Sequence, residues 1–221
     1  MNKPDLKHQI SKTMKRQISH IIVAVMFLSV AVTSCKKEKD EENVMTMTTS
    51  ASGEVTISLA GTGSATIDWG DDSAKETKTI FPYNATSPTQ FNHNYSETKI
   101  CTMKIYGENV TYLNCNYLQL TSLDVSNNTA LTELYLIDSQ LTSLDVNENI
   151  ALTWLNCANN QLTAAALDDL FGTLHNNSTP VKKFIVIYGN PGTNDCNISI
   201  ATDKGWEPLK SLDDIFNTNQ K

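Results

Sequence analysis

The sequence is poor in the residues on which most catalytic and nucleic-acid sites depend. Of its 221 residues only four are histidine and five are cysteine, and 7% are aromatic. No Cys-x-x-Cys, Gly-x-Ser-x-Gly or P-loop pattern occurs, which argues against the sites built on those motifs. Lys and Arg number 17 against 24 Asp and Glu, whereas a nucleic-acid binder needs a basic surface. These absences predict a non-enzymatic protein with no cofactor and no nucleic-acid partner.

The segment 1–34 has the pattern of a secretory signal peptide. Five Lys or Arg precede an apolar run over residues 21–32, and that run is shorter than the roughly 20 residues that span a bilayer. The segment Val32-Thr-Ser-Cys35 resembles a bacterial lipobox. The resemblance implies that residues 1–34 are removed and that Cys35 carries the membrane-anchoring lipid. The remaining chain has 12 Lys or Arg against 23 acids, a net charge of −11.

The residues that follow Cys35 bear on location. Residues 36–42 are Lys-Lys-Glu-Lys-Asp-Glu-Glu, which resembles the signal that sends Bacteroidota lipoproteins to the outer cell surface. This resemblance implies an outer-membrane protein that faces outside the cell. The alternatives are periplasmic retention and a charged linker without a targeting role. Residues 35–52 as a whole are expected to form an acidic and polar linker.

A 21-residue repeat organises residues 108–206. Residues 120–128 recur at 141–149, residues 131–136 recur at 152–157, and residues 110–115 are an earlier copy. The period and the Leu-x-x-Leu-x-Leu pattern predict a leucine-rich repeat, whose coils stack into a parallel sheet. Alternation places one set of side chains inside: Leu113, Cys115, Leu134, Leu136, Leu155 and Cys157. Asparagines that should bond the turning backbone follow at Asn128, Asn149, Asn160 and Asn190.

The amino-acid sequence of these repeats resembles the 21-residue repeats of internalin-J-type surface proteins. Beyond them, helical spacing of apolar residues predicts one amphipathic helix over residues 163–174. A strand is expected from Ile185, and residues 196–206 are expected to close the stack. This ending resembles the terminus of many Bacteroidota leucine-rich-repeat lipoproteins. Residues 207–221 are polar and are expected to fray.

Residues 53–107 show a different, antiparallel β pattern. Apolar residues alternate over 55–59 and over 65–69, which predicts two strands joined by a turn at Gly61-Thr-Gly63. Thr66-Ile-Asp-Trp-Gly-Asp71 and His93-Asn-Tyr95 resemble the marks of PKD-type β-sandwich domains. We expect His93 and Tyr95 to fix a loop, and the module to cap the first repeat. The fold class is therefore mainly β: a short leucine-rich-repeat solenoid capped by an N-terminal antiparallel, sandwich-like module.

Two further sites are suggested in the Asp-rich turn of this module. Asp68, Asp71 and Asp72 are candidate calcium ligands, although Asp-rich turns between strands are usually only turns. Asp72-Ser73-Ala74 resembles the Bacteroidota O-glycosylation site, which implies Ser73 as the modified residue. No other metal site is expected.

The outward residues of the repeat strands form the candidate ligand face. One column holds Tyr112, Glu133 and Trp154, the next holds Asn114, Tyr135 and Asn156, and Tyr188 is expected on the following strand. Aromatic and amide side chains on one face suit a protein or glycan ligand. The alternative is that they only cover the sheet. The leading hypothesis is thus a lipid-anchored adhesion or binding protein. The runner-up is an accessory subunit of an outer-membrane assembly without a ligand of its own.

Overall fold

Eleven β-strands form one mixed sheet in the computed structural model, which describes residues 43–83, 87–178 and 180–218. The protein is therefore mainly β, as predicted. The sheet order is β11-β10-β9-β8-β6-β2-β5-β1-β7, with β3 and β4 also paired to β2. Contacts group Asp40–Lys221 into one compact unit. The predicted boundary at residue 107 falls inside a continuous core that runs from Met45 to Trp206.

The long strand β2 (Gly53–Asp68) is the hub of the N-terminal half. Its first part pairs with β4 (Thr89–Tyr95) and β6 (Asn109–Asn114). Its second part pairs with β3 (Glu76–Ile80) and β5 (Cys101–Tyr106). The predicted turn at Gly61-Thr-Gly63 is wrong, because β2 continues through it with a register shift between Ala60 and Gly61. A bulge thus takes the place of a turn.

Strand β1 (Val44–Thr49) lies within the segment expected to be a linker. It pairs antiparallel with β5 on one side and with β7 (Leu120–Asp124) on the other. Met45 and Met47 are buried in the core. The linker prediction is therefore wrong for residues 44–49. Methionine is not among the residues enriched in strands. The alternation of buried Met with Thr was therefore a weak signal for a strand.

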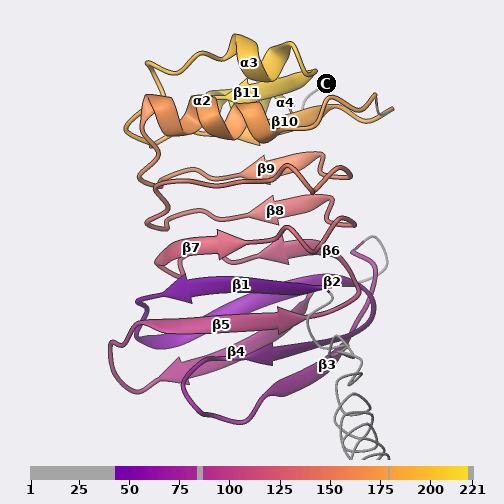
Figure 1. Ribbon diagram of the computed structural model, residues 1–221, viewed down its shortest axis with the longest axis vertical. Coiled ribbons are helices and arrows are strands. Elements are labelled where there is room, and N and C mark those ends of the chain that lie inside the picture. The colour runs from indigo at the N-terminus through magenta and orange to yellow at the C-terminus, as the bar shows by residue number, and fades with distance from the viewer. Residues whose placement is uncertain (1–42, 84–86, 179, 219–221) are drawn as a thin grey trace, which may run out of the picture. The chain divides into compact units, whose positions relative to one another are not determined.

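The C-terminal half contains five parallel strands, of which the first three are spaced by the sequence repeat. Strands β6, β8 (Glu133–Tyr135) and β9 (Trp154–Asn156) are in register, and one strand step equals one period of the repeat, so that Tyr112, Glu133 and Trp154 are neighbours. Strands β10 (Lys183–Val186) and β11 (Trp206–Leu209) extend the same parallel arrangement. Figure 1 shows β6, β8, β9 and β10 one above another. The residues predicted to lie inside are buried: Leu113, Cys115, Leu134, Leu136, Leu155 and Cys157.

Three helices complete the described fold. The predicted helix is α2 (Ala164–Thr173), whose Thr163 hydroxyl accepts a hydrogen bond from the Ala166 amide as an N-cap. It buries Leu167, Leu170 and Phe171. A short helix α3 (Ser199–Thr202) leads into β11.

The third helix corrects the expectation of a frayed tail. Residues 206–209 form β11 and Leu212–Thr218 forms α4. Ile215 of α4 packs against a small apolar cluster of Ala158, Val186 and Leu209. The Asp214 carboxylate also accepts hydrogen bonds from the Lys210 and Ser211 amides, which fixes the start of the helix.

Candidate functional site

A row of aromatic side chains crosses the outer face of the parallel strands. It consists of Tyr83, Tyr112, Tyr135, Trp154 and Phe184. Neighbouring ring centroids are 4.7, 5.3, 6.4 and 5.5 Å apart in that order, within the range of favourable aromatic pairs. We call this set the aromatic row. It runs from the segment between β3 and β4, across β6, β8 and β9, to β10.

The aromatic row overlaps the predicted ligand face only in part. Tyr112, Tyr135 and Trp154 belong to both. Tyr188 does not, because it lies two residues beyond the end of β10, and the β10 residue that pairs with Trp154 is Phe184. The sequence held a signal for Phe184. The offset that relates Asn160 to Asn190 also relates Trp154 to Phe184. Tyr83 carried no such signal, because it lies outside the repeats.

The polar members of the predicted face are already engaged with the protein. The Tyr135 hydroxyl donates to the Glu133 carboxylate at 2.9 Å. Asn114 and Asn156 accept hydrogen bonds from the backbone amides of Asn116 and Ala158, two residues further on. Burial, together with the nearby Glu133 carboxylate, raises the pKa of Tyr135 well above its usual value. Tyr135 therefore presents a neutral hydroxyl at every physiological pH.

Exposure varies along the aromatic row. Tyr112 is only 7% exposed, beneath Tyr83, which is 48% exposed. Tyr135, Trp154 and Phe184 are partly exposed. The Trp154 indole N–H is buried without a hydrogen-bond partner among the described residues. Since the rings pack against each other, a ligand would meet their outer edges and the groups between them.

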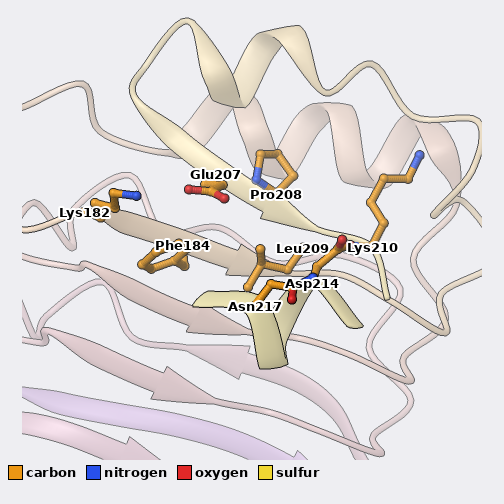
Figure 2. A pocket seen from close by; sticks show the side chains of 8 residues that line it. All are labelled: Lys182, Phe184, Glu207, Pro208, Leu209, Lys210, Asp214 and Asn217. Carbon is orange, nitrogen blue, oxygen red and sulfur yellow. The ribbon is translucent and has the colours of Figure 1, made fainter. Parts of the chain in front are cut away.

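The row ends at a hollow of about 520 Å³ on the face of β10 and β11. Its lining residues come from these strands, from the residues next to them and from α4: Lys182, Phe184, Glu207, Pro208, Leu209, Lys210, Asp214 and Asn217. Figure 2 shows Lys182 and Glu207 at one end and Lys210 at the other. The hollow thus combines an apolar floor with charges of both signs.

The predicted asparagines form two ladders rather than one. The Asn160 amide donates to the Leu136 and Cys157 carbonyls and accepts from the Leu141 amide. Asn190 repeats this pattern one step further along. Asn149 instead donates to the carbonyls of Val125 and Asn128, in the other ladder. The Asn128 side chain is buried without a partner in the described part of the chain, because β1, and not another copy of the repeat, lies beside β7.

Two carboxylates of the Asp-rich turn after β2 make separate contacts. Asp68 pairs with Lys75 at 3.2 Å, and Asp71 contacts His93 Nε2 at 2.7 Å. His93 stacks on Trp69, and the Tyr95 hydroxyl donates to the Trp69 carbonyl. These contacts fix the turn, as expected of His93 and Tyr95. No cluster of three or more metal-binding side chains occurs in the described ranges, so Asp68, Asp71 and Asp72 do not converge.

Asp71 in this turn is expected to make the stability of the protein depend on pH. Partial burial raises the pKa of Asp71, but hydrogen bonds from Ser73 and His93 outweigh it and lower the pKa from 3.8 to about 2. Because the pKa of Asp71 is lower in the folded protein than in the unfolded chain, ionised Asp71 stabilises the fold at pH values above the unfolded-state pKa. This stabilisation is lost as pH falls from about 4 through about 2. Denaturation at several pH values should show a smaller loss over this window in Asp71→Asn than in the wild type. Equal losses would contradict the assignment.

All four cysteines in the described ranges are free thiols. Cys101, Cys115 and Cys157 are buried, and Cys196 is partly exposed. Burial raises the pKa of Cys157 to about 12 and that of Cys115 further still. Neither forms a thiolate near neutral pH, which is the state that a nucleophile or a metal ligand requires. Both thiols instead fill the core.

The predicted signal peptide and the predicted lipidation site, Cys35, lie outside the described residues, as does most of the predicted linker. Among the residues described, no helix is long and apolar enough to span a bilayer. Comparison of the chain with protein-family models, with curated proteins and with solved structures finds no significant match in any of the three.

Proposed function

We propose that the protein is a non-enzymatic lipoprotein, anchored through Cys35 on the outer surface of a bacterial outer membrane, that binds a protein or glycan ligand. The anchoring part is supported by the basic and apolar N-terminal pattern before Val32-Thr-Ser-Cys35. The binding part is supported by the aromatic row and the adjoining hollow.

We further propose that β6 to β11, with the coils between them, are a short leucine-rich-repeat solenoid. In-register parallel strands at steps of one repeat period and the paired Asn160 and Asn190 amides support it. The antiparallel strands before them then correspond to a PKD-like module. Its β2 pairs with β6 and its β1 with β7, so the module would continue the stack at both walls.

The aromatic row is the observation that carries the binding proposal. Aromatic side chains on one face, with polar groups beside them, are enriched where proteins bind macromolecules. The row has both features, because Glu133 and the Tyr135 hydroxyl lie between its rings. It also ends at the hollow, which offers charged groups over an apolar floor. An accessory subunit would need no such continuity between row and hollow.

Removing two rings tests the binding face. Tyr135→Ala and Trp154→Ala should each weaken binding of the full-length protein at least tenfold, since truncating a central aromatic residue commonly costs about 2 kcal/mol. The ligand is first chosen by screening glycans and extracellular-matrix proteins. Ile100→Ala is the control, because Ile100 is 73% exposed and outside the row. If the screened ligand binds the two folded variants normally, or if nothing binds, the accessory role is favoured.

A second test addresses the anchor. Cys35→Ala should move the protein from the membrane fraction to the soluble fraction, because the lipid has no other attachment point. Wild-type protein on intact cells should be degraded by added protease. A Cys35→Ala protein that still fractionates with membranes and stays accessible to protease would refute the lipid anchor.

A further inference from the structure

A second row of residues follows the carboxyl ends of the parallel strands. Tyr117, Asp138, Asn159 and Gly189 occupy the same place in successive coils, and all have left-handed backbones with φ of 64°, 56°, 53° and 75°. The amides of Tyr117, Asp138 and Asn159 each donate to a carbonyl of the next coil: Ile137, Ala158 and Tyr188. These bonds hold the four positions one strand spacing apart.

Tyr117 is out of place in this series. Glycine, asparagine and aspartate tolerate a left-handed backbone, whereas a bulky residue there is strained. The Tyr117 side chain gains little packing in return, because it is 68% exposed. A strained and exposed aromatic residue is better explained by a surface role than by stability.

The neighbours of Tyr117 supply groups that complement its ring. The Asn159 amide donates to the Asp138 carboxylate at 3.1 Å. Tyr188, next in the chain to Gly189, is partly buried, and burial raises the pKa of its hydroxyl. The Asp138 carboxylate raises that pKa further. The Tyr188 carbonyl accepts the hydrogen bond from the Asn159 backbone amide, which places Tyr188 at the end of the same series. We call Tyr117, Asp138, Asn159 and Tyr188 the edge row.

We propose that the edge row binds a neutral oligosaccharide, whose sugar rings stack on Tyr117 and Tyr188 and whose hydroxyls bond to Asp138 and Asn159. The row has no Lys or Arg of its own, and Asp138 would repel an acidic glycan. Three strand spacings, roughly 14 Å, separate the coils of the two tyrosines, so the ligand is an extended chain. This proposal rests on the proposed function, in that the protein is displayed where it meets glycans.

Tyr117→Gly separates a binding role of the ring from a structural role, because it should weaken binding without lowering stability. The variant removes the ring and relieves the left-handed strain. Binding of the full-length protein to neutral hexasaccharides of glucose or xylose should therefore fall at least tenfold, while the free energy of unfolding stays equal or rises. A ring with only a structural role would instead lower stability. Calorimetry measures the first quantity and urea denaturation the second.

Asp138→Asn identifies the class of ligand, since it keeps a residue that tolerates the backbone but removes the charge. Neutral-glycan binding should weaken only a few-fold and should not depend on salt. If none of the hexasaccharides binds, or if Tyr117→Gly binds them as the wild type does, the proposal is wrong. It is also wrong if a lysine-rich peptide binds instead, with an affinity that falls in salt and is lost in Asp138→Asn.

The aromatic-row variants keep the two proposals distinguishable. When Trp154→Ala abolishes binding of the screened ligand and Tyr117→Gly leaves all binding unchanged, the edge row fails and the aromatic row stands. When Tyr117→Gly reduces hexasaccharide binding and Tyr135→Ala and Trp154→Ala leave binding of the screened ligand unchanged, the edge row stands and the aromatic row fails.

Discussion

Replacing Asn160 by alanine is expected to lower the free energy of unfolding by about 4 kcal/mol, since each stranded buried group costs roughly 1–3 kcal/mol. The Asn160 side chain is 1% exposed. Its amide nitrogen donates to the carbonyls of Leu136 at 2.8 Å and Cys157 at 3.1 Å. Its carbonyl accepts from the Leu141 amide at 3.0 Å. Alanine would leave the Leu136 carbonyl and the Leu141 amide buried without this partner, whereas the Cys157 carbonyl keeps its hydrogen bond from the Asn190 side chain.

The repeat itself provides a matched control for Asn160. Ser139 occupies the corresponding place one coil earlier, and its buried hydroxyl has no hydrogen-bond partner among the described residues. Ser139→Ala should therefore change the free energy of unfolding by less than about 1 kcal/mol. Urea denaturation of both variants at one pH gives the comparison. Equal losses in the two would show that the asparagine ladder does not stabilise the coils as described.

The 21-residue period carried most of the correct structural predictions. It predicts that Tyr112, Glu133 and Trp154 are neighbours, and they are, because one period is one strand step. It failed where α2 lengthens a coil, so that the step from Trp154 to its partner Phe184 exceeds one period. The prediction of Tyr188 on this strand is therefore wrong, and Phe184 takes its place. The offset from Asn160 to Asn190 points to Phe184.

The candidate site was less predictable than the repeat, because burial on the outer face depends on segments outside it. Tyr83 covers Tyr112, and Ile215 of α4 packs on Val186. Neither segment shares the period. Tyr117, Asp138 and Asn159 were not predicted for another reason: their common feature is a left-handed backbone, which Tyr117 and Asp138 do not signal as glycine does.

The N-terminal half was predicted least well, at the point where it joins the repeats. Two glycines in Gly61-Thr-Gly63 suggested a turn, whereas β2 continues through them and changes partners there. Gly61 has a φ of 155°, and its amide donates to the Phe81 carbonyl. A Cβ at this position would lie 2.0 Å from the Asn109 carbonyl oxygen at the start of β6. Glycine is thus required by close approach rather than by chain reversal.

Gly61→Ala is accordingly expected to lower the free energy of unfolding by about 3 kcal/mol or more, from steric overlap together with backbone strain.

Gly63→Ala is the matched control. Gly63 also has a positive φ, 94°, but a Cβ there meets no atom within 4 Å, so it should lose only roughly 1–2 kcal/mol from strain. Urea denaturation measures both losses, and hydrogen exchange of the Ala60 and Tyr112 amides, which are opposite each other, reports on the β2–β6 pairing. Because β2–β6 and β1–β7 are the strand pairings between the two halves among the described residues, faster exchange confined to Gly61→Ala would place the defect at this junction. If Gly61→Ala is as stable as Gly63→Ala, the close approach does not constrain the junction.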